Sequence, residues 1–348
     1  MEHVKKHIGA EFANSIVWEL LALPPRHSSF YKRLGSDIRT TRFLLNKLNQ
    51  DPANHVLVIT GNSSILWVLK FFVNTIHGDK KIQVIFHGTL AALGSRRSLR
   101  PHKRICDMRV SLKRFNHRRI QYIVLEESIR DAVLQELPFL KDHIFVLDIP
   151  IPLDEEAKGT DNFSSPIQFG FLGLANEHKG FSKYLAVAEE ISTKFPGLAE
   201  FHVVGRLGNQ YRNLDIPGIA FLKDRPGVER LSRDEYTQRL SELNFVCFFC
   251  EDRYYKFSAS AVLLDSIAWE KPIIAPRMPI FKNLERKFGD IGYLCENGDF
   301  SKVIGTILKE MDSDRYKRQV LNMRAAKNSR TPESLARKYR ELVERFKS

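Results

Sequence analysis

The stretch of sequence that decides the fold reads FGFLGLANEHKGF, from Phe169 to Phe181. Its first half is apolar, which predicts a buried strand that ends at Gly173. A polar loop follows, and Lys179-Gly180 opens a segment with helical periodicity. Glycines let a backbone approach a ligand, a helix start offers unpaired N–H groups, and a lysine adds a full charge. Taken alone, this pattern also fits an ordinary strand–loop–helix unit with a solvated lysine.

Three further places in the second half end an apolar run with groups suited to an anion. The run HVVGR ends at Arg206, whose guanidinium can hold a phosphate through two parallel hydrogen bonds. The apolar run 245–250 leads to Ser258 and Ser260, which are good N-caps and leave a helix start bare for a diphosphate. A short apolar run, PIIA at 272–275, follows that helix. Four such places in chain order indicate an anion site along one sheet edge.

The spacing of such runs along the whole chain predicts two α/β domains. Strand-like runs lie at 15–21, 55–60, 81–86, 121–125 and 144–147, and again at 167–172, 200–204, 219–222, 245–250, 272–275 and 292–294. Helical periodicity lies between them, at 31–49, 64–76, 181–194, 232–243, 259–269 and 300–311. Strands that alternate with helices form parallel sheets, so each half is expected to be a doubly wound α/β domain.

A proline-rich stretch divides the two halves. Residues 149–166 contain three prolines among polar residues, which marks an interdomain linker at 151–166. We therefore expect an N-terminal domain at 1–150, a C-terminal domain at 167–330, and a helix at 331–348 that packs back towards the first domain. Two doubly wound sheets joined in this way face each other across a cleft, with strand carboxyl ends on both sides.

Composition excludes several classes of protein. The chain of 348 residues is 43% hydrophobic and 27% charged, which is typical of a globular protein, and no apolar run is long enough to span a membrane. The N-terminus lacks the apolar core of a secretory signal, so we expect a cytoplasmic location, with peripheral attachment as the route to a membrane. Cys247 and Cys250 lie in a strand-like run, where alternation points them to opposite faces and favours core packing over a metal site.

The net charge of +13 is concentrated in one segment that we expect to be helical. Residues 96–119 contain one carboxylate, Asp107, and ten cations: Arg96, Arg97, Arg100, Lys103, Arg104, Arg109, Lys113, Arg114, Arg118 and Arg119. This excess indicates an acidic partner, and an anionic membrane surface is the expected one. A solvated helix face is the plain alternative. Nucleic acid is not expected, because nucleic-acid-binding segments interleave aromatic rings and this one holds only Phe115.

Together, the four motifs of the second half resemble the C-terminal half of retaining GT-B glycosyltransferases of the glycogen-synthase-like superfamily. The resemblance implies a GT-B fold, with an N-terminal acceptor domain and a C-terminal domain that binds a nucleotide-diphosphate sugar. It implies metal-independent transfer without a cofactor, in which Lys179 and Arg206 stabilise the leaving diphosphate. It also implies a histidine that touches the donor sugar, matched by His87, and a donor-binding set: Gly173, Asn176, Gly180, Gly205, Glu251, Ser258, Ser260 and Asp265.

The sequence departs from the family pattern at three positions. Asp265 stands on the second glutamate of the family's Glu-x7-Glu element, which is implied to bind the ribose hydroxyls. Phe257 stands on the first glutamate, which touches the sugar in the family, and a phenyl ring cannot accept those hydrogen bonds. Glu251 or Asp252 is then the candidate replacement. Leu174 stands where the family often has arginine, so the resemblance leaves the sugar and the anomeric outcome open.

The implied reaction moves a sugar, with UDP as the default nucleotide, to a glycan or lipid-linked saccharide in the assembly of cell-surface polysaccharide or lipopolysaccharide. The cations Arg96, Arg97, Arg100, Lys103 and Arg104 are expected to bring the acceptor side to the membrane. Two other classes stay open. A GT-B-type sugar-nucleotide epimerase would need carboxylates on both sides of the cleft, with Glu126 and Glu127 as its candidates in the first half. A basic nucleic-acid-binding protein would also explain the net charge.

Overall fold

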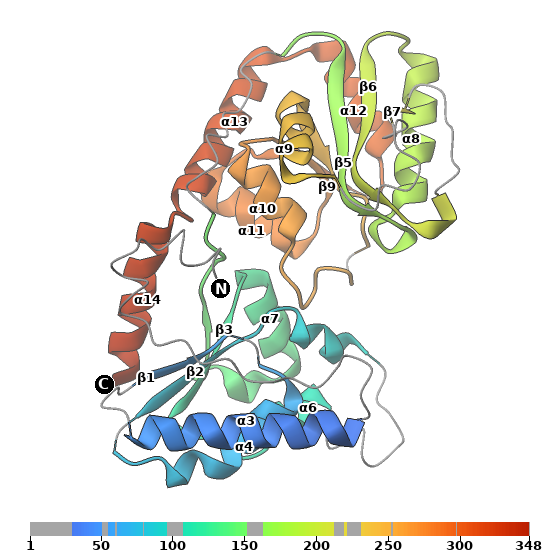
Figure 1. Cartoon of the computed structure of the whole chain (residues 1–348). Coiled ribbons are helices and arrows are strands. Elements are labelled where there is room, and N and C mark those ends of the chain that lie inside the picture. The colour runs from blue at the N-terminus through green and yellow to red at the C-terminus, as the bar shows by residue number, and fades with distance from the viewer. Residues whose placement is uncertain are drawn as a thin grey trace.

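The computed structural model describes residues 30–50, 55–59, 61–78, 80–95, 107–151, 163–211, 219–220, 231–251, 253–296 and 298–347. They form two α/β units, each built on one parallel sheet, as the alternation of strands and helices predicts. Figure 1 shows the units one above the other, with α13 (Ser313–Asn328) and α14 (Pro332–Lys347) running along one side of both. The expected strand at 15–21 and the cations Arg96, Arg97, Arg100, Lys103 and Arg104 lie outside the described residues.

The first unit has four parallel strands in the order β1-β2-β3-β4. Its elements are α3 (Phe30–Gln50), β1 (His55–Val58), α4 (Ser63–Phe72), η1 (Val73–Thr75), β2 (Lys81–Ile85), η2 (Thr89–Gly94), α6 (Met108–Lys113), β3 (Ile120–Val124), α7 (Glu127–Glu136), η3 (Pro138–Leu140) and β4 (Ile144–Val146). One core cluster joins the inner strands to the helices on one face, and it includes Leu66, Val84 and Tyr122. The strands of this unit are apolar because both faces of the sheet are covered.

The second unit has six parallel strands in the order β10-β9-β8-β5-β6-β7. Its elements are β5 (Ile167–Ala175), η4 (Glu177–Lys179), α8 (Phe181–Lys194), β6 (Ala199–Leu207), η5 (Asn209–Tyr211), β7 (Ile219–Ala220), α9 (Arg233–Glu242), β8 (Phe245–Cys247), α10 (Ala261–Ala268), β9 (Ile273–Pro276), α11 (Pro279–Phe288), β10 (Gly292–Cys295), α12 (Phe300–Glu310) and α13. The expected helix 181–194 matches α8. The expected strand 245–250 is shorter, because its parallel pairing ends at Cys247.

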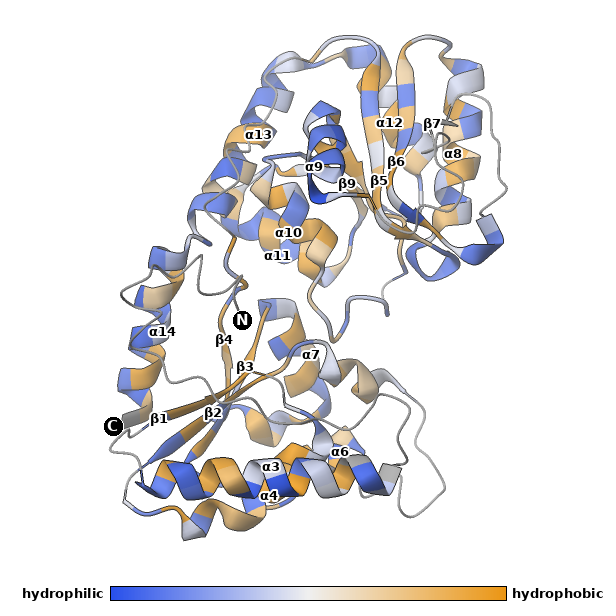
Figure 2. Ribbon diagram, in the orientation of Figure 1, coloured by the Kyte–Doolittle hydropathy of each residue, from blue (hydrophilic) through white to orange (hydrophobic). Residues whose placement is uncertain are grey.

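Two core clusters cover the two faces of the second sheet. One packs under α8 and α12 and contains Phe169, Tyr184 and Cys247. The other packs under α9, α10, α11 and α13 and contains Leu172, Val246 and Cys250. Cys247 and Cys250 are therefore buried on opposite faces without a disulfide, as strand alternation predicts. Figure 2 shows hydrophobic residues along β9 and alternating hydrophobic and hydrophilic residues along α3 and α14.

Helix α14 leaves the second unit and covers the first sheet on the face opposite α3. The hydroxyl of Tyr339 lies 3.1 Å from Nε2 of His55 on β1, and the ring of Phe346 packs edge-on against the same histidine. Lys81 of β2 stacks over the Phe346 ring. Tyr339 also packs against the apolar side chains at the carboxyl ends of β2 and β3. The chain thus returns to its first unit after completing the second.

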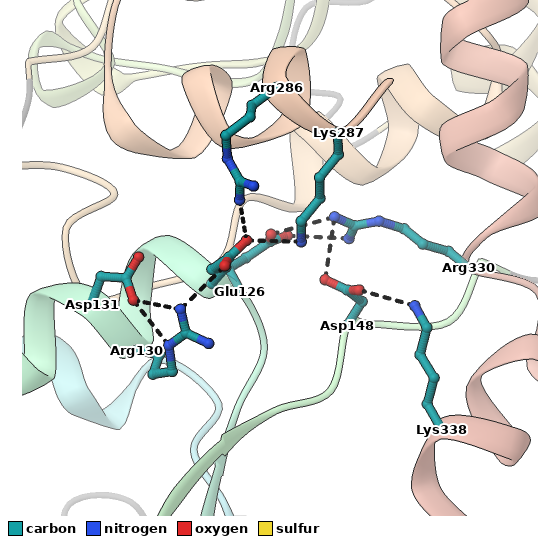
Figure 3. A network of polar contacts seen from close by, with 9 residues as sticks. Glu126, Arg130, Asp131, Asp148, Arg286, Lys287, Arg330 and Lys338 are labelled. Atoms are coloured by element: carbon teal, nitrogen blue, oxygen red, sulfur yellow. Dashed lines mark hydrogen bonds and ion pairs between the residues drawn. The ribbon is translucent and has the colours of Figure 1, made fainter. Parts of the chain in front are cut away.

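An ion-pair network joins the two units where α14 begins, as Figure 3 shows. Arg330 forms a two-pronged contact with the Glu126 carboxylate, at 3.1 and 3.3 Å, and its guanidinium also lies 3.6 Å from Asp148. The side chains of Glu126 and Arg330 are 11% and 5% exposed, so this pair is shielded from solvent. A second group lies beside it, in which Glu127 of α7 contacts Arg286 and Lys287 of α11.

The expected helix across the basic segment is wrong in its described part. Helix α6 ends at Lys113, and the backbone of Phe115 then takes a left-handed conformation with φ of 53°. That conformation cannot continue a right-handed helix. Of the segment's cations, the structure therefore places Arg109 and Lys113 on the helix, and Arg114, Arg118 and Arg119 on the turn that follows it.

Candidate functional site

The carboxyl edge of the second sheet is shaped by two glycines on neighbouring strands. Gly173 of β5 and Gly205 of β6 are register partners, with φ of 79° and 148°. A Cβ on Gly205 would lie 2.2 Å from the Gly173 carbonyl oxygen, closer than any side chain can approach. Glycine is therefore required here, and it lets the two backbones come together next to Lys179.

Lys179 is held in place by the loop that carries it. Asn176 caps η4, because its side-chain oxygen accepts a hydrogen bond of 3.0 Å from the Lys179 N–H. Gly180 follows in the left-handed region, and a Cβ there would lie 2.2 Å from the Phe249 carbonyl oxygen. Asn176 and Gly180, both predicted to contact the donor, thus have clear roles in shaping the loop. These contacts fix the backbone from which the Lys179 side chain extends.

The Lys179 ammonium lies at the start of α10. It lines a small cavity with Leu172, Cys250, Tyr255 and Val262, and its nitrogen would lie 3.0 Å from a Cβ on Gly173. Burial lowers the pKa of this ammonium below its usual value, and the nearby Cys250 and Asp265 partly offset that effect. Asp265 acts through space, but no carboxylate of the described residues forms an ion pair with Lys179. A desolvated cation in this position is suited to receive an anion.

The start of α10 differs from the prediction in one residue. Ser260 is the N-cap, because its buried hydroxyl accepts a hydrogen bond of 3.1 Å from the Leu263 N–H. Ser258 was expected to share this role, but its hydroxyl donates to the Tyr254 carbonyl at 3.4 Å. Of the two serines, only Ser260 therefore caps the first turn of α10 with its hydroxyl.

Asp265 lies on α10 facing α9. The Tyr236 hydroxyl donates a hydrogen bond of 2.7 Å to its carboxylate, and Arg233 lies 4.0 Å away. Burial raises the pKa of the Asp265 carboxyl above its usual value, against the opposing effect of the Tyr236 hydrogen bond. Sequence reasoning missed Tyr236 and Arg233, although the capping box Ser232-x-x-Glu235 marked the start of their helix.

Arg206 lies at the end of β6, beside Leu174 of β5. It follows Val204 by two residues, so strand alternation points it to the face that α9 and α10 cover. Leu174 is 42% exposed, which leaves open surface next to the arginine. Lys179 and Arg206 thus approach the edge from η4 and β6, respectively.

The first unit contributes the opposite side. His87 follows β2 and is exposed, and Gly88 turns the chain in the left-handed region to begin η2. Phe257 comes from the loop of the second unit but is buried in the core cluster of the first unit, close to Gly94. The neighbouring Lys256 pairs with Glu136 of α7 at 3.1 Å. The loop after β8 therefore crosses from one unit to the other.

Of the two carboxylates proposed to replace the missing sugar contact, the structure describes Glu251, which directly follows Cys250 of the Lys179 cavity. Glu251 is exposed and pairs with Arg253 at 3.1 Å, and Asp252 lies outside the described residues. Glu126, a candidate acid for epimerisation, is held by Arg330. Within the described part of the chain, no helix is long and apolar enough to cross a bilayer.

Comparison with known proteins identifies the fold. No family model and no curated protein matches the sequence. Among solved structures, TarM superimposes with a TM-score of 0.56 and 14% identity over 91% of this chain, which spans 58% of TarM. Sucrose-phosphate synthase from Thermosynechococcus elongatus gives 0.59 and 14%, over 93% of this chain and 80% of that protein. HepE from Anabaena, solved with UDP and glucose, gives 0.61 and 12%, over 94% and 85%. These similarities establish the GT-B fold, as the sequence motifs predict.

Proposed function

From the GT-B fold of this chain, we propose that it is a glycosyltransferase that takes a sugar from a nucleotide diphosphate. The observation that carries the proposal is the Lys179 ammonium, half-buried in the cavity at the start of α10 and without a carboxylate partner among the described residues. Most buried lysines are paired, so a desolvated cation at a strand edge is a candidate for binding an anion. Structures of the same fold hold UDP, which makes a uridine nucleotide the first donor to test.

The proposed chemistry is stabilisation of the leaving diphosphate. Breaking the bond between sugar and phosphate develops negative charge on the phosphate oxygens. Lys179 and the N–H groups at the start of α10, together with Arg206 from the end of β6, would stabilise this charge. These protein cations support transfer without a metal ion. In a retaining reaction, the acceptor hydroxyl attacks on the leaving-group face and gives its proton to the departing phosphate.

The proposed acceptor is a glycan or a lipid-linked saccharide in cell-surface polysaccharide assembly. His87, an exposed group directly after the buried strand β2, is the residue of this unit that we propose contacts the donor sugar. The cations Arg96, Arg97, Arg100, Lys103 and Arg104 support docking of this unit on an anionic membrane surface from the cytoplasmic side. The local excess of positive charge is what favours a membrane acceptor over a dissolved one.

The function is tested by nucleotide binding followed by turnover. Thermal-shift measurements with UDP, GDP, ADP and CMP should show a raised Tm with one nucleotide, since a ligand that binds the folded state stabilises it. Lys179→Met should then lower turnover of the matching sugar nucleotide by about a hundredfold. The matched control is Lys183→Met, which removes an exposed lysine from α8 and should leave turnover unchanged. Near wild-type turnover in a folded Lys179→Met protein would show that the donor site is elsewhere.

A further inference from the structure

A half-buried tryptophan and two exposed phenylalanines form a contiguous aromatic patch on the first unit. Trp67 and Phe71 of α4 and Phe115 of the turn after α6 contact one another, with centroid separations of 6.0, 6.0 and 5.6 Å. Phe71 is 65% exposed and Phe115 is 60% exposed. Single exposed apolar residues are common, but rings that cluster on the surface mark a site of interaction.

The backbone presents Phe115 in a costly conformation. Its φ of 53° is one that bulky residues rarely adopt, because the Cβ crowds the carbonyl oxygen. Lys70, a buried lysine of α4, stabilises the chain on both sides of Phe115. Its ammonium donates to the carbonyl oxygens of Ser111, Leu112 and Arg114 and to the side chain of Asn116. An outlier that its surroundings hold in place is a candidate for a functional role.

Cations flank Phe115 in the sequence. Residues 113–119 carry Lys113, Arg114, Arg118 and Arg119 and no carboxylate. Lys113, Arg114 and Arg118 are exposed, whereas Arg119 donates to the Ile76 carbonyl. Exposed rings with cations beside them match the interface of an anionic bilayer, where aromatic side chains sit at headgroup depth and lysine or arginine contacts phosphate.

We propose that Trp67, Phe71 and Phe115 insert into the interfacial layer of an anionic membrane while the cations beside them bind the headgroups. This inference rests on the membrane attachment in the proposed function and assigns it to described residues. Figure 1 shows α4 and α6 at the end of the first unit that points away from the second unit. Docking through this end leaves the second unit clear of the bilayer.

Vesicle binding of the full chain tests the insertion. The double variant Phe71→Ser/Phe115→Ser should bind vesicles of phosphatidylglycerol and phosphatidylcholine at least about tenfold more weakly than wild type, because two apolar rings no longer leave water. Both side chains are exposed, so the fold should tolerate the change. Phe139→Ser, which removes an exposed ring of η3 outside the patch, is the matched control and should bind like wild type.

Trp67 supplies an independent readout of depth. Vesicles with brominated acyl chains should quench the fluorescence of wild type, and Trp67→Phe should remove most of that quenching. Binding that is equal in the double variant, or binding without quenching of Trp67, would overturn the proposal. It would also be overturned by equal binding to phosphatidylcholine alone, or by dimerisation of wild type that the double variant abolishes, since a second copy would then cover the rings.

The outcomes separate this inference from the function it rests on. Sugar-nucleotide turnover in solution should be unchanged in Phe71→Ser/Phe115→Ser, because the patch lies far from Lys179. A wild-type protein that inserts Trp67 but turns over no sugar nucleotide would contradict the proposed function and support the docking surface. A protein that turns over the donor but binds no anionic vesicle would support the proposed function and contradict the docking surface.

Discussion

Two lysines of the second unit, one buried and one half-buried, show how one residue type takes different roles. Lys271 has no exposed surface, and its ammonium donates a hydrogen bond of 2.7 Å to the Ser241 carbonyl. Lys179 lies at the cavity beside α10 and has no ion-pair partner among the described residues. Only the contacts distinguish a lysine that supports the fold from one that is available for a ligand.

Lys271 should make stability depend on pH in the alkaline range. Burial lowers its pKa from 10.5 to about 8 in the folded state. Between these values the unfolded chain binds the proton that the folded chain has lost, so the free energy of unfolding rises with pH. Relative to Lys271→Met, the wild type should gain about 3 kcal/mol across this window. Urea unfolding at several pH values measures the difference, and parallel curves for the two proteins would refute the assignment.

At the scale of elements, the helices α9 and α10 meet through Tyr236 and Asp265. The same carboxylate is the one that the family resemblance assigns to the ribose. These roles are compatible only if a nucleotide binds beside the carboxylate or displaces the tyrosine. Substitution of Asp265 therefore tests whether α10 contacts a nucleotide.

Asp265→Asn should raise the donor KM by about tenfold with a smaller effect on kcat, because a ribose contact holds the substrate equally before and during reaction. Tyr236→Phe is the matched variant, since it removes the protein partner and keeps the carboxylate. Its donor KM should stay at or below the wild-type value. If both substitutions lower the Tm and neither changes nucleotide affinity, the aspartate is a structural residue.

Elements were predictable where a local pattern dictates them. The strands β2, β3 and β5 are mostly apolar because parallel strands are buried on both faces. Helix α13 was missed although its buried residues Tyr316, Val320 and Met323 have helical spacing, since polar residues dominate the rest of it. The signal for α11 was equally present, in the Pro279 that opens it.

At the scale of the molecule, the network around Arg330 fixes how the two units meet. Its partner Glu126 is 204 positions away in the sequence, at the start of α7. No periodicity or motif links residues at that distance, so the contact could not be predicted. Glu126 is a candidate catalytic acid by sequence alone, because a carboxylate that follows a strand has the same sequence pattern whether it is catalytic or forms a structural ion pair. Phe257 is a similar case, because its ring reaches the core of the other unit.

Arg330→Met should lower the free energy of unfolding by about 3–5 kcal/mol, because it leaves the Glu126 carboxylate buried without its ion-pair partner, while Asp148 keeps only its 3.7 Å contact with Lys338. Arg286→Met is the matched control. That arginine pairs with Glu127 but is 62% exposed, so its loss should have an effect within about 1 kcal/mol. Denaturant unfolding measures both. Equal effects of the two substitutions would mean that the shielded pair does not hold the units together.

The return of α14 to the first sheet has a consequence for how the protein is made. Residues 332–347 cover β1 and β2 through Tyr339 and Phe346, yet the ribosome makes them after the whole second unit. Domains usually fold in the order of their synthesis. Here the earlier unit lacks the contacts of Tyr339 and Phe346 until the later one has been translated. The first unit is therefore expected to reach its final form when residues 332–347 emerge from the ribosome rather than when residue 150 does.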